Sequence, residues 1–284
     1  MVLIWNFIFI YLIKYILTDK KIKSNRKLDS IQVIEIKVIS GTKVKIVNSD
    51  FIPDRVYLKG ELYSIDSTGS VLNLNENIND IRMEWDIKRG KYSKLFRNIE
   101  SMIEVNFTDF DTTEVTLLSN MFQNCKNLKK ITFNDKFNTS SVSDMTSMFE
   151  NCISLTSLDL SIFDTRIVAK MEGMFRNCQS LTSLDLSNFQ TPKLLKIAYM
   201  FQDCESLEYL DISNMDTSLI TYMNGTFSDC WSLISLNLTN FDTRKVIFMN
   251  EMFMNCKKLE LIDLSSFITN NVIDSLICFM GVIL

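Results

Sequence analysis

Six cysteines recur at a nearly constant spacing and are the first residues whose chemistry needs an explanation. They are Cys125, Cys152, Cys178, Cys204, Cys230 and Cys256, separated by 27, 26, 26, 26 and 26 residues. A metal site needs ligands that converge from different directions, and the chain has no CxxC motif and no histidine. Equivalent residues of a repeat point the same way, which makes a disulfide torsion unfavourable. We therefore predict a row of buried structural thiols, with no metal site and no cofactor.

A second repeating set carries carboxylates and hydroxyls at strand-like positions. Its members are Asp159, Asp185, Asp211, Asn237 and Asp263, followed two residues later by Ser161, Ser187, Ser213 and Thr239, with Tyr209 in a flanking row. Such a face could bind a partner or a cation such as Ca²⁺, which prefers carboxylate oxygens. The alternative is a solvated row whose carboxylates accept hydrogen bonds from the neighbouring hydroxyls, which would reduce their mutual repulsion. Both interpretations remain open, and the set is our candidate binding surface.

The overall composition excludes several other functions. The chain has 284 residues, 30 Lys and Arg against 34 Asp and Glu, seven Gly and no His. Without histidine, Ser-His-Asp and Cys-His catalytic sites are unavailable. The glycines form neither GxGxxG nor GxxxxGK[ST], so the usual phosphate-binding loops are absent. The net charge of −4 also argues against a nucleic-acid partner. We expect a protein that is not an enzyme.

The elements that position these rows are visible in one repeat unit. Leu155–Leu181 reads LTSLDLSIFDTRIVAKMEGMFRNCQSL. Leu158 and Leu160 alternate with polar residues, which is typical of a short strand with one buried face. The second half has apolar residues every three or four positions, at Val168, Met171, Phe175 and Cys178. This spacing predicts an amphipathic helix, with Asp164 or Thr165 as its N-cap.

A fixed period of this length predicts an α/β solenoid of stacked strand-turn-helix units whose strands pair in one parallel sheet. Further phenylalanines recur at core spacing beside the cysteines, at Phe163, Phe189 and Phe241. We interpret the phenylalanine and cysteine rows together as the structural core of the stack.

The repeat text L-x-x-L-D-L-S-x-F-D-T-x-x-V-x-x-M-x-x-M-F-x-x-C resembles that of the BspA-like leucine-rich repeat surface proteins. The matches are LTSLDLSIFDT (155–165), LTSLDLSNFQT (181–191), LEYLDISNMDT (207–217), LISLNLTNFDT (233–243) and LELIDLSSFIT (259–269). The resemblance implies a right-handed leucine-rich-repeat-like solenoid on a bacterial or protist cell surface. It also implies adhesion or recognition as the role, without catalysis.

We divide the chain into four segments. Residues 1–18 contain the apolar run MVLIWNFIFIYLIKYIL (1–17), which could contact or span a membrane as an uncleaved anchor. An atypical signal peptide and a segment buried elsewhere are the alternatives. Residues 19–30 form a basic linker. Residues 31–91 contain alternating runs and are expected to form a small β-rich N-terminal cap, or else a separate binding domain. Residues 92–284 hold about seven 26-residue units, the last one truncated.

These features favour a non-enzymatic surface recognition or adhesion module that binds a protein or glycan partner through the solenoid. The alternative is an intracellular, membrane-tethered assembly scaffold, because the basic cluster after the apolar run would remain in the cytosol under the positive-inside rule. The open C-terminal edge, ending in the apolar residues 280–284, further predicts end-to-end self-association.

Overall fold

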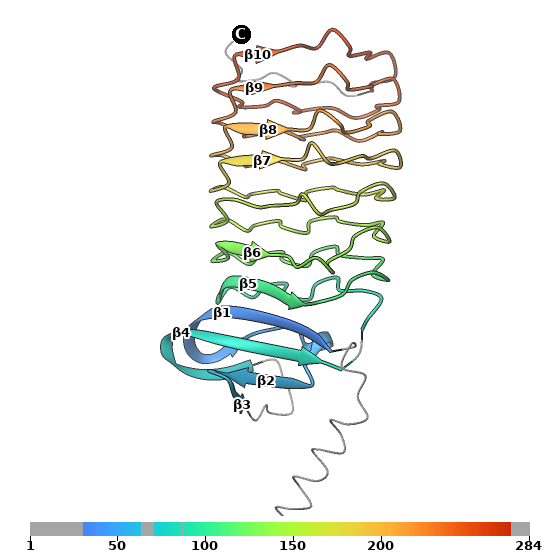
Figure 1. Ribbon diagram of the computed structural model, residues 1–284. Coiled ribbons are helices and arrows are strands. Elements are labelled where there is room, and N and C mark those ends of the chain that lie inside the picture. Colours follow the sequence, from blue (N-terminus) through green and yellow to red (C-terminus); the bar gives the residue numbers. More distant parts are fainter. Residues whose placement is uncertain (1–30, 64–70, 87, 274–284) are drawn as a thin grey trace, which may run out of the picture.

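Stacked repeat units made of tight turns and short strands form most of this protein, shown in Figure 1 as a computed structural model that describes residues 31–63, 71–86 and 88–273. The elements are β1 (Gln32–Lys45), the 3-10 turn η2 (Ser49–Phe51), β2 (Arg55–Leu58), β3 (Glu61–Tyr63), β4 (Val71–Trp85), β5 (Met102–Asp109), β6 (Lys130–Thr132), β7 (Ser183–Asp185), β8 (Tyr209–Asp211), β9 (Ser235–Leu236) and β10 (Leu261–Ile262). Strands β5 to β10 lie on one side of the stack (Figure 1).

The N-terminal strands and the first repeats share one sheet. Its order is β3-β2-β4-β1-β5-β6, antiparallel from β3 to β5 and parallel between β5 and β6. Two further parallel pairs, β7 with β8 and β9 with β10, continue along the stack. On another side of each unit a column of isolated parallel bridges runs from Lys91 to Phe248. The antiparallel sheet therefore continues directly into the repeats.

The predicted helix in each unit was wrong, and so was the single parallel sheet. Within the three described ranges there is no α-helix, and the strands belong to one mixed sheet and two short parallel pairs. In the segment that we expected to be helical, Phe175 donates its N–H to Met200 of the next unit (2.9 Å), whereas Cys178 donates to Phe175 (3.1 Å). Such bonds alternate along the segment. A helix would instead require bonds from each N–H to the carbonyl four residues earlier.

Left-handed backbone conformations explain why the helical spacing appears without a helix. Gly173 and Asn177 both have φ of +59°, and equivalent residues of the other units also have positive φ. Each reverses the chain within a tight turn, so apolar side chains return to the interior every three or four residues. The expected N-cap has another function as well: Thr165 donates its hydroxyl to the carbonyl of Gln190 in the next unit (2.9 Å).

The core is a continuous column of aromatic rings and thiols. Successive ring centroids lie 5.5–5.6 Å apart along Phe96, Phe122, Phe149, Phe175, Phe201, Phe227 and Phe253. Beside this column each cysteine donates its thiol to a phenylalanine carbonyl of the preceding unit, as Cys204 does to Phe175 (3.2 Å). Because every unit buries its apolar side chains against two neighbours, the stack is stabilised along its whole length.

An amide ladder connects the units near the surface. The side chain of Asn151 donates to that of Asn124 (2.6 Å), and Asn177 donates to Asn151 (2.6 Å). The next two equivalent residues are Asp203 and Asp229, whose side chains lack the NH₂ group with which an asparagine donates. The ladder of donated amide bonds is therefore interrupted at residue 203.

Candidate binding face

The outward side chains of the mixed sheet form two rows that cross its strands. The name strand face is used below for this surface together with the equivalent outward positions of the later units. In the first row the register places the following residues side by side: Tyr57 (β2), Arg82 (β4), Glu35 (β1), Asn106 (β5) and Thr132 (β6). Thr132 precedes Asp159 by one unit, so the predicted acidic row continues into the N-terminal strands.

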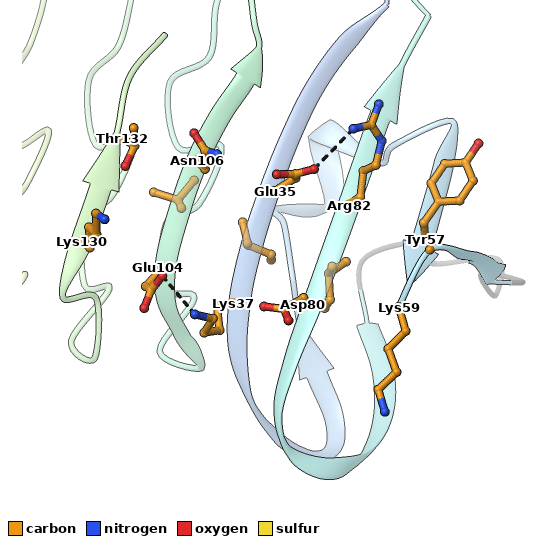
Figure 2. Close-up of a pocket in the computed structure, with 14 residues that line it drawn as sticks. Glu35, Lys37, Tyr57, Lys59, Asp80, Arg82, Glu104, Asn106, Lys130 and Thr132 are labelled. Carbon is orange, nitrogen blue, oxygen red and sulfur yellow. Dashed lines mark hydrogen bonds and ion pairs between the residues drawn. The ribbon is translucent and has the colours of Figure 1, made fainter.

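The second row alternates in charge. Asp80 (β4), Lys37 (β1), Glu104 (β5) and Lys130 (β6) lie beside one another in register. Figure 2 shows the two ion pairs that join strands here: Lys37 with Glu104 at 3.2 Å and Arg82 with Glu35 at 3.3 Å. Because these side chains are about a third to two fifths exposed, each pair contributes little to stability. The paired groups remain accessible to a ligand.

A groove of about 450 Å³ lies over these two rows. Its polar lining comes from the ten residues labelled in Figure 2: Glu35, Lys37, Tyr57, Lys59, Asp80, Arg82, Glu104, Asn106, Lys130 and Thr132. Tyr57 is half-buried and is the one aromatic side chain in this lining. The groove thus presents both charges, amide and hydroxyl groups, and a single ring.

A second hollow of about 310 Å³ adjoins the first and shares Lys130 and Thr132 with it. It lies beside an irregular unit. The spacing from Cys125 to Cys152 is 27 residues instead of 26, and the additional residue lies between Phe133 and Phe137. Residues 155–160 form no strand, so the strand pairing stops at β6 and resumes at β7. The two hollows together, here called the trough, run from β2 towards the repeats.

The predicted acidic row serves the turns that follow its strand positions. The Oδ1 atoms of Asp159, Asp185, Asp211 and Asp263 each accept the backbone N–H of the serine two residues later at 2.9 Å, from Ser161, Ser187, Ser213 and Ser265. Asn237 accepts from the N–H and hydroxyl of Thr239 at 3.2 and 2.8 Å. These bonds to backbone N–H groups lower the pKa of Asp159 and of Asp185. These hydrogen bonds stabilise the turns, and this structural role accounts for the repeated carboxylates without a ligand.

The trough brings together only part of the predicted surface. Asp159 lines the second hollow, whereas the later members of its row lie further along the stack. Tyr209, on β8, is 56% exposed and its hydroxyl lies 3.5 Å from Asp211. Binding by these residues stays a prediction.

The predicted core residues are all buried. The six cysteines are inaccessible to solvent, and Phe163, Phe189 and Phe241 are at most 3% exposed. Burial raises the pKa of the Cys125, Cys204 and Cys256 thiols to about 12. Across residues 31–63, 71–86 and 88–273, no three His, Cys, Asp or Glu side chains are grouped so as to hold a metal ion.

Sequence reasoning missed the contribution of the N-terminal strands to the face. Glu35 and Lys37 alternate with buried isoleucine and valine in IQVIEIKVI, as Asp80 and Arg82 do around Ile81. This alternation was a usable signal that they point outward. It does not reveal that β1 lies between β4 and β5, because that register depends on pairing between distant segments.

The repeats match a known protein family. Residues 90–210 and 196–282 match the family described as "Mycoplasma protein of unknown function, DUF285". The chain belongs to this family. The match covers the repeats rather than the apolar segment, and it supports the relation to BspA-like proteins that the repeat text indicated.

Two solved structures are similar to the chain. A leucine-rich repeat protein from Bacteroides ovatus is 20% identical, with a TM-score of 0.46, over 76% of this chain and 53% of that one. A leucine rich cell surface protein from Faecalibacterium prausnitzii is 19% identical, with a TM-score of 0.36, over 53% of this chain and 42% of that one. The chain thus spans about half the length of the first structure. No curated protein matches the chain.

Two expectations concern the ends of the chain. In the part that the structure describes, no helix is long and apolar enough to cross a membrane. The anchor or signal segment at 1–17 and the self-associating edge at 280–284 both lie outside the described residues. Both stay predictions.

Proposed function

We propose that this protein is a non-enzymatic recognition module displayed at the cell surface, which binds a protein or glycan partner through its strand face. The observation that supports this most directly is the trough. Its charged side chains lie on an accessible sheet surface, and Glu104 and Glu35 are held 3.2 and 3.3 Å from the cationic groups of Lys37 and Arg82. An arrangement of fixed, paired hydrogen-bonding groups suits recognition.

The repeat text and the apolar run at residues 1–17 support placement at a surface. The competing proposal, an intracellular scaffold tethered to the membrane, is favoured by the basic residues that follow this run. The two proposals differ in which side of the membrane carries the solenoid.

Protease digestion of intact cells that express the full chain separates them. We expect added protease to remove the repeats while a cytosolic marker stays intact. Repeats that remain protected until the membrane is permeabilised would contradict surface display and favour the scaffold.

A further inference from the structure

The trough limits what a ligand can contact. Under the first hollow the backbone groups of β2, β4, β1 and β5 are already paired within the sheet, because each of these strands has neighbours on both sides, whereas β6 is paired with β5 alone. Ile36, Ile81 and Val105 contribute to its floor but are at most 3% exposed, with their side chains in the core. In the first hollow a ligand therefore meets polar side chains and the ring of Tyr57.

This composition disfavours the two common modes of protein recognition. A peptide that adds a strand needs an open sheet edge, whereas the first hollow lies mainly across β2, β4, β1 and β5, which have neighbours on both sides. A typical protein interface is centred on an apolar or aromatic anchor buried in a pocket, and the first hollow exposes charged and amide groups around one tyrosine. A ligand rich in hydroxyl groups fits better.

Sugar hydroxyls match the paired charges. A hydroxyl can donate to the carboxylate of Glu104 while its neighbour accepts from the ammonium of Lys37, and the 3.2 Å separation of these two groups brings them within reach of adjacent hydroxyls. Glu35 and Arg82 offer the same combination at 3.3 Å on the neighbouring row. Tyr57 supplies a ring against which the C–H face of a sugar can pack.

The second hollow extends the site along the stack. It offers Ser157 and Asp159 as further hydrogen-bonding groups, together with the partly buried Phe133 and the side chain of Ile162, which is 45% exposed. Because Lys130 and Thr132 line both hollows, a linear ligand can occupy them together. We propose that the trough binds a linear oligosaccharide that spans both hollows, an inference that rests on the proposed recognition function.

The test measures binding of the full chain, in a sugar-free detergent, to a panel of neutral and uronic-acid-containing oligosaccharides and to extracellular-matrix proteins. We expect oligosaccharide binding that strengthens with chain length. Tyr57→Ala in the first hollow and Ile162→Ser in the second should each weaken it about tenfold. Tyr222→Ala is the matched control, because Tyr222 is 36% exposed in the bridge column instead. Circular dichroism and thermal unfolding verify that each variant is folded.

The outcomes separate the two proposals. Oligosaccharide binding that is unaffected by Tyr57→Ala and Ile162→Ser overturns the trough as the site but leaves the recognition function in place. Binding to a matrix protein alone overturns the oligosaccharide and also leaves recognition in place. If no member of the panel binds, the oligosaccharide proposal fails, whereas the recognition function is judged separately by the protease experiment on intact cells.

Discussion

The ring of Tyr199 occupies the space beside Gly225 of the next unit, so that a Cβ atom added at residue 225 would lie 2.5 Å from Cδ1 of Tyr199. Both residues have φ of +59° and hold equivalent positions in successive turns. The guanidinium of Arg176 lies over the same ring, 5.5 Å from its centroid. The backbone conformation thus favours glycine at residue 225, and the room that the tyrosine ring needs requires it.

Gly225→Ala should therefore destabilise the protein by about 2–3 kcal/mol, from the steric overlap together with the cost of a left-handed alanine. In a Tyr199→Ala background the cost should fall to about 1 kcal/mol, because only the backbone term remains. Gly90→Ala is the control, since its nearest neighbour would be the carbonyl oxygen of Glu114 at 3.9 Å. Urea unfolding measures the stability of the wild type, the two single variants, the double variant and the control, and equal costs of Gly225→Ala in both backgrounds would refute the overlap.

Replacing Asp203 with asparagine should repair the amide ladder. Burial raises the pKa of Asp203, and the charge of Asp229 and of Glu205 adds to this, while Arg176 acts in the opposite direction. The folded state therefore holds this proton more tightly than the unfolded state does, so the stability that the residue contributes at low pH is lost as the pH rises through its native pKa.

Asp203→Asn should accordingly stabilise the fold by about 1 kcal/mol at neutral pH, where it supplies a donor to Asn177. The gain should shrink below the ordinary aspartate pKa of about 3.9, where a protonated Asp203 can itself donate. Unfolding at the two pH values checks this prediction. An equal gain in stability at both pH values would show that the charge of Asp203 is not what interrupts the ladder.

The buried threonine of each unit offers a further test. Thr191 is 1% exposed and donates its hydroxyl to the carbonyl of Asp216 in the next unit at 3.0 Å. Thr191→Val keeps the shape but leaves that carbonyl without this donor, and should cost about 1–2 kcal/mol. The same substitution at the exposed Thr182 should change stability by less than about 0.5 kcal/mol. Similar costs at both sites would contradict a specific role for the buried hydroxyl.

The six core thiols should resist alkylation in the native protein. Burial keeps them protonated and out of reach, so peptide mapping after brief exposure to iodoacetamide at mildly alkaline pH should find them unmodified until the protein is unfolded. Cys204 and Cys230, in the middle of the stack, should become reactive together. Rapid native modification of either would contradict the continuous core.

The period, the core rows and the outward acidic row could all be read from spacing alone, because each unit repeats the same inward and outward positions. The helix could not, since left-handed turns return apolar side chains at helical intervals. The residues before the core cysteines gave a warning: Asn124, Asn151 and Asn177 are poor helix formers that tolerate positive φ. The trough could not be predicted from the sequence, because Tyr57 and Arg82 lie beside the repeat rows only through the pairing of strands that are distant in the chain.

The most direct test of the account compares two sides of the stack in one binding measurement. The ligand is whichever member of the oligosaccharide and matrix-protein panel the wild-type chain binds most tightly. The double variant Tyr57→Ala/Lys130→Ala alters the strand face, and Lys170→Ala/Lys196→Ala alters the bridge column. We predict that the first raises the dissociation constant about tenfold or more, while the second leaves it nearly unchanged. The reverse result would contradict recognition through the strand face.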